Sequence, residues 1–122
     1  MPIVDVELVC ASEADLAAVS PRGIADALGA IFGSEPGRTW VRLRCLPASA
    51  YAENDCNVSE GELPVFASVL QAHPPQGEAL AEQVRAVTAA LADCVRRPPE
   101  HVHVRYEPAA AGRQAFGGRL VE

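Results

Sequence analysis

The sequence contains no lysine, no long apolar run and no excess of positive charge. All ten cationic residues are arginines, and sixteen aspartates and glutamates leave a formal net charge of −6. Nucleic acids and anionic membranes attract proteins through a basic surface, so this balance argues against both as the main partner. The planar guanidinium of arginine fits a carboxylate, and a small anionic ligand is therefore compatible with the acidic total.

Signals for membrane insertion, secretion and zinc binding are also missing. No apolar run reaches the roughly 18 residues that predict a membrane-spanning helix. The first ten residues carry Asp5 and Glu7 and no basic residue, unlike a secretory signal. The four cysteines show no CxxC spacing, and His101 and His103 have no third ligand at a sensible spacing. We therefore expect a cytoplasmic protein with free thiols and no metal site.

Hydrophobic periodicity predicts an α/β chain with one core. With 122 residues, 49% of them apolar, the chain has room for a single domain over residues 1–122. Alternating or β-branched-rich segments predict four strands, over residues 2–9, 39–46, 64–71 and 101–107. Apolar residues three and four apart predict two helices, over residues 21–32 and 77–97. A further helical turn is expected at 13–18 and a short strand or hairpin within 108–122.

The order β-α-β occurs twice, and the two halves resemble each other. MPIVDVEL at the start matches LPVFASVL at 63–70, an offset of 62, whereas later positions match at an offset of 63, including Leu28 with Leu91 and Arg42 with Arg105. These matches suggest a duplicated unit, with repeats of about 2–61 and 63–122. Two right-handed crossovers would place both helices on one face of a four-stranded mixed sheet.

The second face of that sheet would need a cover of its own. The inward-facing candidates of the sheet are apolar, and a sheet with one face left uncovered predicts a homo-oligomer. These candidates are Val4, Val6, Leu8, Val41, Leu43 and Val69.

Pro2 begins the first predicted strand. An initiator methionine is normally removed before proline, and removal of Met1 would leave Pro2 with a free secondary amine. Burial disfavours the charged form of an amine and lowers its pKa, so a buried prolyl amine would be a base suited to moving a proton next to a carbonyl. The plainer alternative is that Pro2 only starts a strand, where proline is tolerated.

Several features of the chain occur together in one known family. They are the Met-Pro-Ile-Val strand, the duplicated β-α-β pattern and an arginine on the second strand of each half. The sequence thereby resembles the tautomerase superfamily over nearly its whole length. It is most similar to the long, two-unit members such as macrophage migration inhibitory factor, malonate semialdehyde decarboxylase and cis-chloroacrylic acid dehalogenase. The resemblance implies a homotrimer with active sites between neighbouring subunits.

The resemblance also implies roles for individual residues. Pro2 matches the catalytic proline of the family. Arg105 stands where the inhibitory factor has an active-site asparagine and could hold a substrate carboxylate bidentately; the alternative is an exposed arginine in an ion pair. Arg42 stands where the short oxalocrotonate tautomerases have a substrate-binding arginine, and Arg44 on the same face competes with it.

Two further positions belong to this implied site. His103 matches an active-site tyrosine of the inhibitory factor, and a structural or interface histidine is the alternative. Gln71 lies at the end of the third strand, where that protein binds a substrate oxygen through a backbone amide. In contrast, Ser34 replaces a pocket lysine, and the acidic residues used by the decarboxylase and dehalogenase are missing near Gly37 and Gln114.

These missing groups argue against decarboxylation and against dehalogenation by addition of water. Proton shuttling needs fewer groups and is therefore the favoured reaction. The sequence therefore predicts a cofactor-independent tautomerase or isomerase that acts on small 2-oxo or 2-hydroxy-unsaturated carboxylates, with Pro2 as the general base. The alternatives are a hydratase, dehalogenase or decarboxylase on the same scaffold, or a non-catalytic trimeric ligand-binding module if Met1 is retained.

Overall fold

The computed structural model describes residues 2–122, so the predicted removal of Met1 concerns a residue outside the described part. One sheet has the strand order β2-β1-β3-β4, with β1 parallel to β2, β1 antiparallel to β3, and β3 parallel to β4. The predicted four-stranded mixed sheet is confirmed. Its strands are β1 (Ile3–Cys10), β2 (Trp40–Pro47), β3 (Val65–Leu70) and β4 (Val102–Tyr106).

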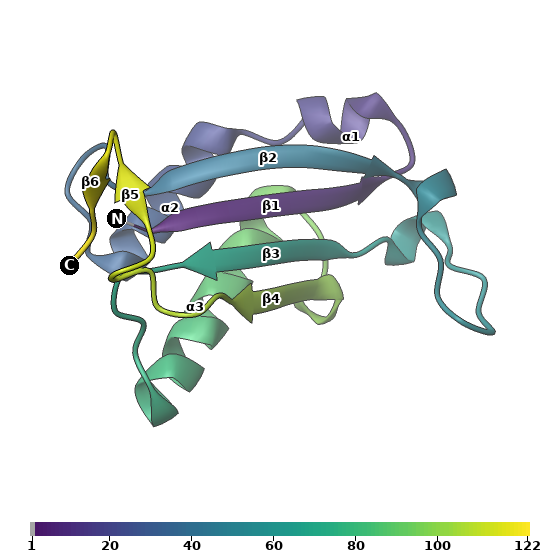
Figure 1. Cartoon of the computed structure of the whole chain (residues 1–122). Helices are drawn as coiled ribbons and strands as arrows, with labels where there is room; N and C mark the ends of the chain where they lie inside the picture. The colour runs from purple at the N-terminus through teal and green to yellow at the C-terminus, as the bar shows by residue number, and fades with distance from the viewer. Residues whose placement is uncertain (1) are drawn as a thin grey trace.

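Both main helices, α2 (Pro21–Phe32) and α3 (Gly77–Val95), lie on one face of the sheet (Figure 1). At the start of α2 the Ser20 hydroxyl accepts a hydrogen bond from the Gly23 amide at 2.9 Å, which caps one otherwise unpaired donor. Gly33 ends α2 in the left-handed conformation with φ of 65°, a backbone state that costs glycine little. The helices expected over 21–32 and 77–97 are therefore confirmed, with α3 two residues shorter than expected.

The smaller expected elements are present as well. A short helix α1 (Glu13–Ala17) follows β1, and a C-terminal hairpin is formed by β5 (Ala115–Phe116) and β6 (Arg119–Leu120). In Figure 1 this hairpin lies beside the N-terminus at one end of the sheet. The C-terminal segment therefore reaches the end of the molecule at which β1 begins.

The core lies between the sheet and the two helices. Successive side chains of a strand point to opposite faces, and the helix-facing set of each strand is apolar. Val41 and Leu43 of β2 pack against this core. Its fully buried members include Val4, Val6 and Leu8 of β1, Val65 and Val69 of β3, Ile24 and Leu28 of α2, and Val87 and Leu91 of α3.

The opposite face of the sheet is uncovered in the single chain and carries mostly charged and polar side chains. We call it the open face and define it by Asp5, Glu7, Arg42, Arg44, Phe66, Ser68, His103 and Arg105. The six apolar candidates named above thus serve the helix-covered core. The open face offers a neighbour ion pairs and hydrogen bonds, with Phe66 as an exposed aromatic residue at 37% accessibility.

Each half pairs its two strands in parallel at the same offset of 37 residues, Ile3 with Trp40 in the first half and Phe66 with His103 in the second. The burial of the strand residues distinguishes the two possible shifts between the halves. A shift of 62 would match the buried Val4 with the exposed Phe66. A shift of 63 keeps equivalent residues on the same face, because side chains alternate with a period of two.

The four cysteines are free thiols, as expected. Two of them, Cys10 and Cys45, lie on the neighbouring strands β1 and β2. Among residues 2–122, none of the helices combines the length and apolar character that crossing a membrane requires.

Candidate functional site

Pro2 lies buried at the amino end of β1, between two neighbouring segments. Its carbonyl oxygen accepts a hydrogen bond from the Trp40 amide at 3.0 Å. On the other side, Ile3 pairs with Leu70, and one more antiparallel step places Pro2 opposite Gln71. Paired residues share a face of the sheet, so Pro2 and Gln71 both lie on the helix-covered side.

A cavity of about 540 Å³ opens at this end of the sheet. We call it the Pro2 cavity. Four segments form it: Pro2 itself, the last residue of α2 with the residues that follow it, a turn residue before β2, and the residues after β3. Its lining consists of Pro2, Phe32, Gly33, Ser34, Glu35, Arg38, Gln71, Ala72 and His73.

Some polar groups of the Pro2 cavity have hydrogen-bond partners within the chain, and others have none among the described residues. Ser34 accepts a hydrogen bond from the Thr39 hydroxyl at 2.7 Å. His73 Nε2 lies 3.0 Å from the main-chain oxygen of Glu122, so that nitrogen carries the donated proton. Gln71 Oε1 is buried and has no hydrogen-bond partner among the described residues. The ion pairs of residues 2–122 do not include Arg38.

The C-terminal segment packs against the end of the sheet at which Pro2 lies. The Ala110 amide donates to the Gln71 carbonyl at 2.8 Å, and the Ala111 amide donates to the Ala72 carbonyl at 3.2 Å. Farther along, the Phe116 ring meets the Trp40 ring edge-on with centroids 5.0 Å apart. These contacts tie the C-terminal hairpin to the strands on both sides of Pro2.

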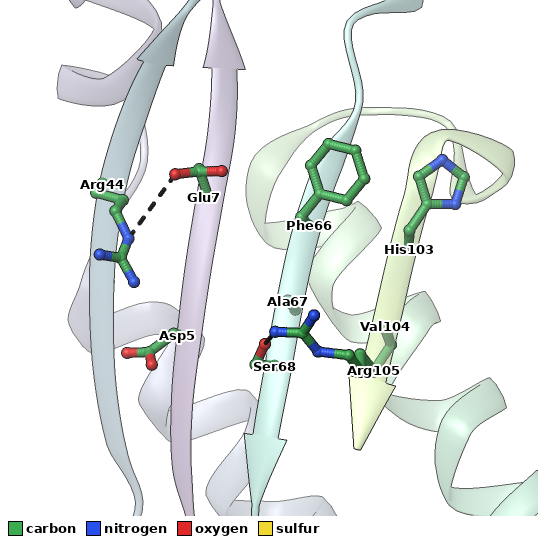
Figure 2. Close-up of a pocket in the computed structure, with 9 residues that line it drawn as sticks. All are labelled: Asp5, Glu7, Arg44, Phe66, Ala67, Ser68, His103, Val104 and Arg105. Carbon is green, nitrogen blue, oxygen red and sulfur yellow. Dashed lines mark hydrogen bonds and ion pairs between the residues drawn. The ribbon is translucent and has the colours of Figure 1, made fainter. Parts of the chain in front are cut away.

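A second cavity, of about 440 Å³, lies on the open face (Figure 2). Arg44 of β2 and Arg105 of β4 line its two sides, with His103 beside the Phe66 ring at a centroid distance of 5.5 Å. Arg105 donates to Ser68 Oγ at 3.1 Å and pairs with Glu107 at 3.2 Å. The predicted ligands His103 and Arg105 are therefore together, in a cavity that does not include Pro2.

Arg42 belongs to neither cavity. Its guanidinium donates to both carboxylate oxygens of Asp5, at 2.5 and 2.8 Å. The hydrogen bonds and charge of Asp5 raise the pKa of Arg42 above its usual value. Arg44 shares the open face, lines its cavity, and lies 4.0 Å from Glu7. Of the two competing arginines, Arg44 faces a cavity and Arg42 is held by its own neighbour.

The structure thus divides the predicted site residues into three groups: Pro2 with Gln71, His103 with Arg105, and Arg42 alone. It also adds Arg38, which the sequence analysis missed. The parallel pairing of the two predicted strands of the first half could have revealed Arg38. A strand that starts at Trp40 beside Ile3 brings the residues just before it next to Pro2.

No protein-family model matches the sequence, and no curated protein matches it by sequence. Solved structures do match. A macrophage migration inhibitory factor from Oncomelania hupensis is 15% identical, with a TM-score of 0.73, over 100% of this chain and 83% of that one. A fused 4-OT wild-type symmetric trimer is 14% identical, with a TM-score of 0.75, over 98% and 94%. Pt0534 inactivated by 2-oxo-3-pentynoate is 16% identical, with a TM-score of 0.72, over 97% and 95%.

The chain has the fold of these solved structures, as the resemblance to the tautomerase superfamily implied. Its element order, its mixed sheet and the side on which both helices lie are those expected from the resemblance. At such identities the likeness extends to the fold, while the chemistry has to be argued from this chain's own residues. In this fold the Pro2 cavity lies at the amino end of the central strand β1.

Proposed function

We propose that this protein is a cofactor-independent tautomerase or isomerase that uses the amine of Pro2 as its general base. The observation that carries the proposal is the buried position of Pro2 in a cavity that also contains Arg38 and Gln71. The cavity therefore combines the three kinds of group that proton shuttling requires: a base, a cation for a carboxylate and a polar side chain for an oxygen atom.

The reaction needs no redox step and no added group. With Met1 removed, the Pro2 nitrogen has a lone pair that takes a proton from the enol oxygen or from the carbon next to the carbonyl. The electron pair moves into the conjugated system, and the same proton returns to the neighbouring atom. Burial and the nearby guanidinium both favour the neutral amine and lower its pKa, whereas the negative end of the α2 dipole opposes them.

The proposed substrates are small 2-oxo or 2-hydroxy-unsaturated carboxylates. Two features support this class. The Pro2 cavity, at about 540 Å³, has room for such an acid and holds an arginine without an ion-pair partner among the described residues. In addition, a structurally similar protein is inactivated by 2-oxo-3-pentynoate, which is itself a short unsaturated 2-oxo acid.

We further propose a homotrimer as the working form. A similar structure is a symmetric trimer, and the open face leaves Arg105 and His103 uncovered in the single chain. In an oligomer these two residues would be available to the Pro2 cavity of a neighbouring copy. The predicted substrate ligands Arg105 and His103 would then act in trans, with Arg42 retained by Asp5.

The direct test combines a mass measurement with a variant. We expect the native protein to lack Met1 by mass spectrometry, and Pro2→Ala to reduce turnover of an enol-pyruvate substrate by about 100-fold or more, because the positioned base is altered. Pro64→Ala is the matched control, since Pro64 precedes β3 as Pro2 precedes β1 and its nitrogen is an amide.

A covalent probe gives an independent result. Treatment with 2-oxo-3-pentynoate should label the amino-terminal peptide of the native protein. Retention of Met1, or unchanged turnover in Pro2→Ala, would contradict the enzyme proposal and leave the non-catalytic ligand-binding module as the better account.

A further inference from the structure

We infer that Trp40 is a positioning residue for Pro2, and that the C-terminal hairpin of β5 and β6 holds Trp40 in place through the Phe116 ring. The inference rests on the proposed function, because it concerns how precisely the amine of Pro2 is held. It makes that amine depend on a segment from the other end of the chain, which lies beside the N-terminus in Figure 1.

Trp40 is bonded directly to the main chain of Pro2. Its amide donates to the Pro2 carbonyl oxygen at 3.0 Å, and Ile3, the next residue of the chain, pairs with Trp40 in the sheet. A peptide group is planar, so this bond fixes the plane between Pro2 and Ile3. A movement of the start of β2 is therefore passed on to the Pro2 nitrogen.

The Trp40 ring is held by two contacts outside the core. Its Nε1 atom donates to the Gly37 carbonyl oxygen at 2.9 Å, and its edge-on contact with Phe116 has an angle of 74° between the rings. Val41 packs against the core, so the preceding Trp40 side chain points to the other side of the sheet. The ring is 48% exposed, and these contacts, rather than deep burial, fix its position.

The C-terminal hairpin is a small element that needs such a contact. β5 and β6 have two residues each, and a two-stranded hairpin by itself is at best marginally stable in water. The Gly112 amide closes its base by donating to the Val121 carbonyl at 2.7 Å, and His73 holds the main-chain oxygen of Glu122 beyond β6. Between these anchors, Phe116 links β5 to β2. Loss of the Phe116 ring should therefore loosen the hairpin from β2 while the sheet stays folded.

The loop that carries Arg38 has hydrogen bonds of its own. The Arg38 amide donates to the Glu35 carbonyl at 3.1 Å, and the Thr39 hydroxyl donates to Ser34 at 2.7 Å. These bonds involve neither the Trp40 ring nor the hairpin. A loosened Trp40 ring should therefore leave the ligand-binding side of the Pro2 cavity in place and displace the base.

This separation predicts an effect on turnover rather than on substrate binding. A misplacement of the reacting groups by about 1 Å can cost about 100-fold in rate, whereas KM is unchanged when the ground-state contacts persist. Neither Trp40 nor Phe116 is among the described residues that line the Pro2 cavity. Both act on the reaction through Pro2.

The hairpin itself supplies a matched control. Phe116 pairs with Arg119, and Ala115 pairs with Leu120, so the Leu120 side chain lies on the opposite face of the hairpin from Phe116. It is 59% exposed. Leu120→Ala therefore removes an apolar side chain from the same hairpin and leaves the ring pair intact.

The first experiment needs neither substrate nor a free amine. Trp40 is the one tryptophan of the sequence, so its fluorescence reports on the ring contact, and solvent exchange of its amide proton reports on the bond to Pro2. In the full chain, Phe116→Ala should raise acrylamide quenching of Trp40 and speed exchange of its amide by about 10-fold. Phe116→Tyr, which keeps the ring, and Leu120→Ala should change neither. Unchanged exchange in Phe116→Ala would overturn the inference.

The second experiment measures turnover of an enol-pyruvate substrate. Phe116→Ala and Trp40→Ala should each lower kcat by about 10-fold and leave KM within about twofold, whereas Phe116→Tyr should retain the original kcat. Because the hairpin acts through Trp40, the double variant should lose no more than either single variant. Additive losses, or a raised KM with an unchanged kcat, would overturn the inference.

The two experiments distinguish failure of this inference from failure of the proposed function. If Pro2→Ala keeps full turnover, the proposed function fails, and exchange of the Trp40 amide alone decides whether the hairpin holds Pro2. If Pro2→Ala is impaired while Phe116→Ala and Trp40→Ala keep their kcat, only this inference fails. Circular dichroism checks folding, and Phe116→Leu, which keeps apolar volume but no ring, replaces Phe116→Ala if the latter does not fold.

Discussion

The two halves of the chain share a topology but treat equivalent arginines differently. Arg42 and Arg105 occupy the same place, 63 residues apart, on the second strand of each half. In the first half the paired residue on the neighbouring strand is Asp5, which binds Arg42 through both oxygens. In the second half the paired residue is Ser68, which offers one hydroxyl to Arg105. Arg105 also pairs with Glu107 at 3.2 Å. Position alone therefore does not make an arginine available to a ligand, because the side chains around it decide.

The ends of the two main helices show the same contrast. α2 ends at Gly33 with φ of 65°, and α3 ends at Arg96 with φ of 57°. These residues are also 63 positions apart, so both halves use a left-handed backbone at the same point. Glycine adopts that conformation readily, whereas a residue with a β-carbon is strained there.

The prediction with the largest expected effect tests whether both halves contribute equally to the hydrophobic core. Leu28 of α2 and Leu91 of α3 are equivalent and fully buried. Each substitution by alanine should lower the free energy of unfolding by about 2–5 kcal/mol, since both leave a cavity in packed surroundings. Denaturant unfolding of the two variants measures this. A cost below about 1 kcal/mol for one of them would show that the core is confined to the other half.

A second prediction concerns a thiol that is fully buried in the first half, whereas Cys94 of the second half is only partly buried. Cys10 is 2% exposed, and the fully buried residues of the second half include no thiol. Burial, with the neighbouring Cys45 thiol as the second cause, raises the pKa of Cys10 from 9.0 to about 11. The native state therefore holds this proton more tightly than the unfolded chain, and the resulting stability is complete below pH 9.

That stability is lost as the pH rises from 9 to 11, by about 3 kcal/mol in total. Cys10→Ala should lower stability at neutral pH through lost packing but should show a flatter decline over this interval. Chemical unfolding at several pH values measures the difference, and Cys56→Ala, which removes an exposed thiol, is the control. Identical slopes for Cys10→Ala and the unmodified protein would contradict the burial argument.

The smallest expected effect exchanges the helix ends. Arg96→Gly should stabilise the protein by about 1 kcal/mol, because the left-handed strain is relieved. Gly33→Ala should destabilise it by a similar amount, since open space surrounds Gly33 and backbone strain is the only cost. Thermal unfolding measures both changes. Opposite signs are required; a loss of stability in Arg96→Gly would mean that the guanidinium contributes more than its backbone strain costs.

The local pattern of the sequence was sufficient for the elements. Alternating residues located the strands, apolar residues three and four apart located α2 and α3, and the repeated order suggested the duplication. The offset of 62 for the first strands was harder to judge, because a shift of one residue exchanges the faces of a strand. The burial of the strand residues identifies 63 as the shift that keeps the faces aligned, because it matches the buried Val4 with the buried Ala67.

The candidate site was predictable only in part. Pro2 stood out because of its place before a strand, and Gln71 because a resemblance placed it there. Arg38 was missed, since a turn residue has no periodicity that reveals which strand end it approaches. Arg42 was favoured from its position alone, because its pairing with Asp5 depends on the register between β1 and β2.

The sequence by itself determined the helices, the strands and the apolar face that forms the core, because these depend on spacing along the chain and on the burial of apolar surface. The tertiary structure alone decided which arginines are engaged and which lies beside Pro2. Ion pairs and cavities depend on distances between segments far apart in sequence, and these distances exist only once the strands have paired.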